Sequence, residues 1–190
     1  MSFAWFLCKN GELYDWLINQ KTIIFKEQIA YQHKRYYNKT MIKNDEYFMK
    51  EAFKEAKKAY KKGEVPIGCV LVNNETKEIL ARAHNLREGK HDISAHAEII
   101  ALKKAGQKSL NRRSENTTLY VTVEPCVMCA GAILQSRISR IVFGIYEPAT
   151  GGFGGKIDLT KEFKSNLTIT SGILKDKIQE LMKQFFEERR

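Results

Sequence analysis

The 190-residue chain contains few cysteines and no long apolar run. No segment approaches the roughly 18 to 20 uninterrupted apolar residues of a membrane-spanning helix, so the sequence predicts no membrane association. Residues 1–8 are apolar but lack a basic start and a small-residue cleavage pattern, so we expect no secretory signal. Four cysteines, two of them in one short motif, do not make a disulfide framework, and we expect a reducing, cytoplasmic location.

Acidic residues are outnumbered by basic ones, 22 against 32, and the net charge is +10. Residues 1–40 contribute six basic and three acidic residues, so most of the excess lies in residues 41–190. Such an excess is expected of a protein that handles a polyanion such as RNA. A lysine-rich composition also arises without any nucleic-acid role, so charge alone does not decide.

Two short motifs carry the chemistry of the chain. Residues 95–98 read Ala-His-Ala-Glu, and residues 125–129 read Pro-Cys-Val-Met-Cys. They offer the imidazole of His96, the thiols of Cys126 and Cys129, and the carboxylate of Glu98, which need not be a ligand. Three such ligands with an open fourth position are typical of a catalytic zinc site. Either motif alone is compatible with other functions, but together they form the signature of zinc-dependent nucleobase deaminases.

The residues around the motifs predict where these side chains lie. Thr117–Val123 is β-branched and apolar, which favours a buried strand. Pro125 suits the start of a helix over Cys126–Gln135, and Ser94–Ala105 is a second helix-prone run. We therefore expect two helix N-termini to face each other across the metal, where their dipoles favour thiolates.

The predicted chemistry is a hydrolytic deamination. Zinc lowers the pKa of bound water toward about 7, and the resulting hydroxide attacks an amidine-like carbon of a nucleobase. Glu98 takes the proton from the water and delivers protons to the ring nitrogen and the departing amine.

Several longer segments resemble the bacterial tRNA-specific adenosine deaminases, over roughly residues 44–190. They are Glu64–Gly68, His84-Asn85, His91-Asp92, Thr118–Ile133 (TLYVTVEPCVMCAGAI), Ser136–Ile138, Arg140–Gly144, Thr150-Gly151 and Phe185-Phe186. The resemblance implies conversion of adenosine to inosine at the wobble position of a tRNA anticodon, with an arginine tRNA as substrate. It also implies one zinc ion per subunit, a homodimer, and an α/β fold of the three-layer α/β/α cytidine-deaminase type with a mixed sheet of about five strands.

The resemblance also implies residue roles. His96, Cys126 and Cys129 would hold zinc, Glu98 would shuttle protons, and the N–H groups near Ala97 and Cys126 would lie close to the reacting oxygen. The implied substrate contacts are Asn85, Glu147 (where the family often has aspartate), Phe185, Phe186, Arg189 and Arg190. Two alternatives stay open: Asn85 as a turn residue, and the last four as part of a core-packing helix with a solvated basic end.

The chain is predicted to divide into an extension, residues 1–40, and a deaminase domain, residues 41–190. The extension lies outside the resemblance, and our hypothesis is that Met41 is the true initiator; a genuine arm is the alternative. Other predicted elements are a helix over residues 45–63, a hairpin of Ile67–Asn73 and Glu78–Ala83, a parallel strand Arg140–Ile145, a flexible substrate-side loop Gly151–Gly155, a strand Leu167–Thr170 and a helix Lys175–Glu188.

Two other functions compete with this interpretation. One is deamination of a free base or nucleoside, of the guanine, cytosine or deoxycytidylate type, which uses the same zinc motif. The other is a zinc-containing RNA-binding module without catalysis, which the open fourth position argues against.

Overall fold

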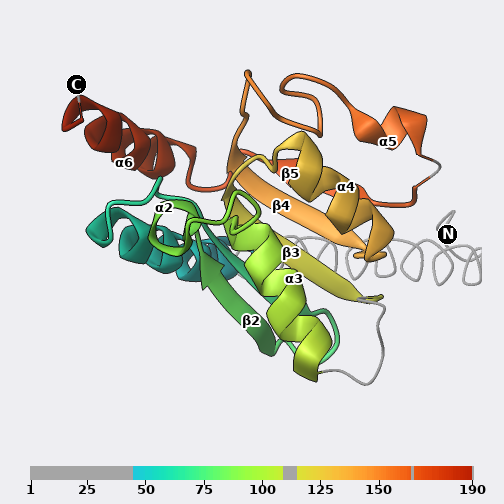
Figure 1. The fold of residues 1–190 in the computed structure, drawn as a ribbon. Coiled ribbons are helices and arrows are strands. Elements are labelled where there is room, and N and C mark those ends of the chain that lie inside the picture. Colours follow the sequence, from blue (N-terminus) through green and yellow to red (C-terminus); the bar gives the residue numbers. More distant parts are fainter. Residues whose placement is uncertain (1–44, 109–114, 164, 190) are drawn as a thin grey trace, which may run out of the picture. The chain divides into compact units, whose positions relative to one another are not determined.

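The computed structural model describes residues 45–108, 115–163 and 165–189; the extension over residues 1–40 and Arg190 lie outside the described residues. Its centre is one five-stranded mixed sheet in the order β2-β1-β3-β4-β5, which confirms the predicted α/β fold (Figure 1). The strands are β1 (Gly68–Asn73), β2 (Ile79–His84), β3 (Thr117–Val123), β4 (Arg140–Ile145) and β5 (Thr168–Ser171). β1 pairs antiparallel with β2 and β3, whereas β3, β4 and β5 run parallel.

Helices cover both faces of this sheet. They are a first helix over residues 45–61, α2 (Arg87–Lys90), α3 (Ala97–Lys108), α4 (Val127–Gln135), α5 (Leu159–Glu162) and α6 (Lys175–Glu187). Side chains of α3 and α4 form one core with one face of the sheet, and side chains of the first helix and α6 form a second core with the other face. The three-layer arrangement follows from this division. None of the described helices is long and apolar enough to cross a membrane.

Strand β3 lies at the middle of the sheet, and all seven of its residues are buried. Alternate side chains enter the two cores, so that Leu119 and Val121 face α3 and α4 while Tyr120 faces the first helix. This explains why the strand carries no charged residue on either face and does not alternate between apolar and charged positions. Gly68, at the start of β1, allows this strand to pack closely against the first helix, because a Cβ at this position would overlap the backbone of Ala52 and Ala56 in that helix.

Some predicted boundaries were wrong. The helix expected over Ser94–Ala105 begins at Ala97. Asp92 accepts hydrogen bonds from the Ser94 backbone N–H (2.8 Å) and hydroxyl (2.7 Å), which holds Ser94 in a turn before the helix. The strands expected at 78–83 and 167–170 each lie one residue further along the chain.

Candidate metal and catalytic site

Both motifs lie at helix N-termini, as predicted. Cys126 has extended backbone (φ −64°, ψ 167°) and immediately precedes α4, whose first turn carries the buried Cys129. His96 immediately precedes α3. Because α3 and α4 pack on the same face of the sheet, the fold brings two segments 30 residues apart in the chain into contact.

The three candidate ligand atoms form a compact group. His96 Nδ1 lies 3.6 Å from Cys126 Sγ and 3.5 Å from Cys129 Sγ, and the three atoms lie within 4.8 Å of one another. Tetrahedral zinc, with Zn–S near 2.3 Å and Zn–N near 2.0–2.1 Å, requires N···S separations of about 3.6 Å. The donor set therefore fits a zinc ion, and the nitrogen that faces the thiols is Nδ1.

The two thiols affect each other's pKa. The hydrogen bond from Cys129 lowers the pKa of Cys126 to about 4, and the same bond together with burial raises the pKa of Cys129. The hydrogen bond with Cys126 also raises the pKa of His96. These closely grouped donors suit a cation, since bound zinc would take the place of the protons on the two thiols.

Glu98 lies in the first turn of α3, beside this group. It is 3% exposed, and its Oε2 has no hydrogen-bond partner among the described residues. Burial raises its pKa from 4.5 to about 7. A buried carboxyl group whose pKa lies near neutrality can hold or release a proton, which general acid–base catalysis requires. The orphaned oxygen also agrees with a further polar group at this site.

Two more predicted residues flank the site. Asn85 is buried and directly follows β2, and the next residue, Leu86, donates its N–H to the carbonyl of Ala95 (3.0 Å). Asn85 thus lies on a segment that is hydrogen-bonded to the residue directly before His96. Ala97 is buried at the first position of α3, and its carbonyl accepts from the thiol of Cys69 (3.1 Å), which is buried as a small core residue.

The predicted C-terminal residues differ in their surroundings. Phe185 is 3% exposed and contacts the ring of Tyr60, with centroids 5.9 Å apart, which favours the core-packing interpretation of this residue. Phe186 is 47% exposed. Arg189 stacks over Phe185 (3.7 Å) and donates to its carbonyl, so its guanidinium is partly engaged within α6.

The loop expected to be flexible is instead tethered. Glu124, to which the sequence analysis assigned no role, accepts backbone hydrogen bonds from Glu147, Phe153 and Gly155. Phe153 is buried in the core below α4. The glutamate directly before the P-C-x-x-C motif, followed after one helix and one strand by a glycine-rich segment, is the signal that could have revealed this contact. Glu147, the predicted substrate contact, is half-buried and bonds the N–H of Ala149 with its own carboxylate (2.9 Å).

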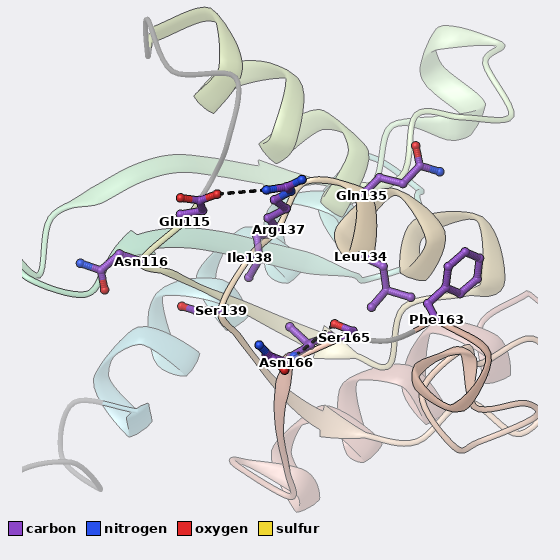
Figure 2. A pocket seen from close by; sticks show the side chains of 11 residues that line it. Glu115, Asn116, Leu134, Gln135, Arg137, Ile138, Ser139, Phe163, Ser165 and Asn166 are labelled. Carbon is purple, nitrogen blue, oxygen red and sulfur yellow. Dashed lines mark hydrogen bonds and ion pairs between the residues drawn. The ribbon is translucent and has the colours of Figure 1, made fainter.

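A separate pocket of about 600 Å³ lies away from these motifs (Figure 2). Its lining comes from the residues just before β3, the end of α4, the turn before β4 and the segment before β5, and includes the ion pair of Glu115 and Arg137 (3.6 Å). These are the amino ends of the parallel strands, whereas Cys126 follows the carboxyl end of β3. Ligands of open α/β sheets bind at carboxyl ends, so the zinc motif is the better candidate site.

Known proteins resemble the chain in both sequence and fold. Residues 42–145 match the family described as the cytidine and deoxycytidylate deaminase zinc-binding region. The chain is 48% identical to a tRNA-specific adenosine deaminase of Bacillus subtilis, over 77% of this chain and 91% of the relative. It is 44% identical to the tRNA-specific adenosine deaminase of Haemophilus influenzae, over 77% and 85%.

Solved structures agree with these matches. A structure from a study of A-to-I editing by tRNA:A34 deaminases at the wobble position of transfer RNA superposes with a TM-score of 0.67 and 34% identity, over 71% of this chain and 98% of that chain. A guanine deaminase from Nitrosomonas europaea has a TM-score of 0.66 at 20% identity, over 74% and 83%, and shares the fold alone. The chain therefore belongs to the zinc-binding cytidine and deoxycytidylate deaminase family and, within it, to the tRNA-specific adenosine deaminases.

Proposed function

We propose that this protein hydrolyses adenosine to inosine at the wobble position of a tRNA anticodon, with release of ammonia. The observation that carries the proposal is the grouping of His96, Cys126 and Cys129 beside the buried carboxyl group of Glu98, in a chain of this family. Among the described residues these are the ones that combine a zinc-ligand set with a proton carrier.

In this proposal His96 Nδ1 and the two cysteine thiolates would hold the zinc ion, which would supply Lewis acidity that makes water nucleophilic near neutral pH. Glu98 does not bind the metal. Its carboxylate would take two protons in turn, one from the attacking water and one from the hydroxyl group that the addition leaves on the ring carbon. It would pass the first to the ring nitrogen and the second to the leaving amine, so that the substrate gains oxygen and loses ammonia. The enclosure of Glu98 keeps bulk water from competing as the proton donor.

We further propose that Asn85 hydrogen-bonds the extruded base and that the backbone N–H groups of Ala97 and Cys126 lie near the reacting oxygen. Glu147, Phe186, Arg189 and Arg190 would contact the anticodon loop around it, whereas the burial of Phe185 makes it a support for Phe186. An extruded base is more easily taken from a loop than from a duplex.

The finer features of the assembly are also proposals. Residues 41–190 would form the deaminase domain, an arginine tRNA would be the substrate, two copies of the chain would assemble into a dimer, and the enzyme would act in the cytoplasm. The basic excess of the chain supports binding of an RNA backbone.

An inosine assay tests the proposal directly. Purified zinc-loaded protein is incubated with an anticodon stem-loop that carries adenosine at the wobble position, and the RNA is digested and analysed by mass spectrometry. We expect a gain of about one mass unit on that base, as an amine is replaced by oxygen. A matched stem-loop with guanosine at the wobble position and adenosines elsewhere should stay unchanged.

Two results would contradict the proposal. Rapid ammonia release from free bases or nucleosides, without conversion of the stem-loop, would assign the enzyme to small substrates. Binding of the stem-loop by zinc-loaded protein without any conversion would assign it to the non-catalytic class. Binding itself should weaken as salt is raised, because phosphate contacts release counterions.

A further inference from the structure

Glu124 places a carboxylate inside the protein between β3 and the cysteine motif. The residue is 3% exposed and accepts three backbone hydrogen bonds. The N–H of Glu147 bonds Oε2 (2.9 Å), and those of Phe153 (2.7 Å) and Gly155 (3.0 Å) bond Oε1. All three donors belong to the segment after β4, residues 147–155, which we call the clamp loop. Hydrogen bonds to an ionised acceptor are about twice as strong as those between neutral groups, so the side chain of Glu124 alone can hold the clamp loop in place.

The clamp loop is bonded in turn to the backbone on both sides of Cys126. Cys126 and Gly151 form an antiparallel bridge. The N–H of Gly152 donates to the carbonyl of Pro125 (2.9 Å), and the N–H of Val127 donates to the carbonyl of Thr150 (3.0 Å). The peptide that carries Cys126 therefore takes its position from the loop as well as from α4.

The glycines of the loop make this contact possible. A Cβ at Gly151 would lie 2.5 Å from the carboxyl carbon of Glu124, and a Cβ at Gly155 would overlap its Oε2. A Cβ at Gly152 would lie 2.6 Å from the Cβ of Ala130 in α4. The glycines thus serve close approach rather than mobility, because any side chain would push the loop away from Glu124 or from α4.

We propose that Glu124 is a positioning residue for the metal site: it holds the clamp loop against residues 125–127 and so fixes the direction of the Cys126 thiol. The inference rests on the proposed function, because it takes Cys126 as a zinc ligand. Glu124 touches neither metal nor substrate in this role. Loss of outer contacts that orient a metal ligand costs about 10–100-fold in metal affinity.

Glu124→Gln is the sharpest test. The amide has nearly the volume of the carboxylate, but its NH₂ group must face one of the three N–H donors, so at least one hydrogen bond is replaced by a donor–donor contact. We expect zinc to leave the variant about tenfold faster or more, measured with a coloured chelator in excess. We also expect the thiolate-to-metal absorption band of the cobalt-substituted variant to shift.

Glu64→Gln is the matched control. Glu64 is also buried and accepts backbone hydrogen bonds, from Glu88 (3.2 Å) and Gly89 (2.7 Å), but these donors lie in α2 rather than beside Cys126. The control should lose thermal stability without faster zinc release or a shifted cobalt band. If Glu124→Gln behaves as this control does, Glu124 has only a general structural role and the inference is overturned.

Two further measurements keep the outcome decisive. If Glu124→Gln does not fold, Glu124→Asp replaces it, because it retains the charge but is one methylene too short to reach all donors; Glu64→Asp is then the control, and equal zinc release would again overturn the inference. Failure of the proposed function is visible separately, in wild-type protein that binds no zinc or leaves the stem-loop unchanged.

Discussion

Substitution of Glu98 by glutamine removes a charge that the metal-free protein buries without full compensation. Burial raises the pKa of this carboxyl group from 4.5 to about 7, so the folded state binds its proton more tightly than the unfolded chain does. Ionised Glu98 therefore destabilises the metal-free fold. The cost is absent below about pH 4.5, grows as the pH rises, and is complete above about pH 7, where it reaches about 3 kcal/mol.

The assay compares metal-free wild type with Glu98→Gln by urea unfolding at pH 4, 5.5, 7 and 8. Groups away from Glu98 cancel to first order, so the difference in free energy of unfolding reports Glu98 together with His96 and Cys129, whose pKa values its charge affects. Between pH 4 and pH 8 this difference should move by about 3 kcal/mol in favour of the variant. A difference that stays constant with pH would refute the argument that burial perturbs this carboxyl group.

The same variant separates proton transfer from metal binding. Zinc-loaded Glu98→Gln should retain its metal, since glutamine replaces a group that does not bind it. Conversion of the stem-loop should fall by about 10²- to 10⁴-fold, the usual contribution of a positioned acid–base group. Full turnover in the variant would reject Glu98 as the proton carrier, and loss of both zinc and fold would make the residue structural.

Three other outcomes follow from the structure. Gly106→Ala, at an exposed position of α3 where a Cβ meets nothing, should raise the melting temperature by about 2–4 °C in a thermal scan; a lower value would contradict this. Asp45→Asn should cost about 1–3 kcal/mol in urea unfolding, because Asp45 pairs with the part-buried Arg140 in a double hydrogen bond (2.8 and 2.7 Å), and an unchanged midpoint would show the pair to be dispensable. Removal of zinc by a chelator should expose Cys126 to iodoacetamide while buried Cys69 stays unmodified in peptide mass spectra; equal labelling of both would indicate unfolding instead.

Much of the fold could be predicted because the relevant signals are local. The β-branched run of β3 specifies a strand that is buried on both faces, and the proline before the cysteines marks the start of α4. The start of α3 was predicted three residues too early, because the side chain of Asp92 competes for the backbone of Ser94 and delays the helix. The glycine content of residues 151–155 likewise predicted a mobile loop. The carboxylate of Glu124, directly after β3, instead holds this loop in place.

The sequence by itself determined the kinds of ligand, their order along the chain and hence the reaction class, since zinc chemistry depends on which donor atoms are available. Only the tertiary structure decided that Nδ1 of His96 faces the thiols, that Glu98 titrates near neutrality, and that Phe185 is buried while Phe186 is exposed. It alone also revealed the contacts of Glu124 with the loop beside Cys126. These properties depend on dielectric surroundings and on contacts between residues far apart in the chain, and no local pattern of residues encodes them.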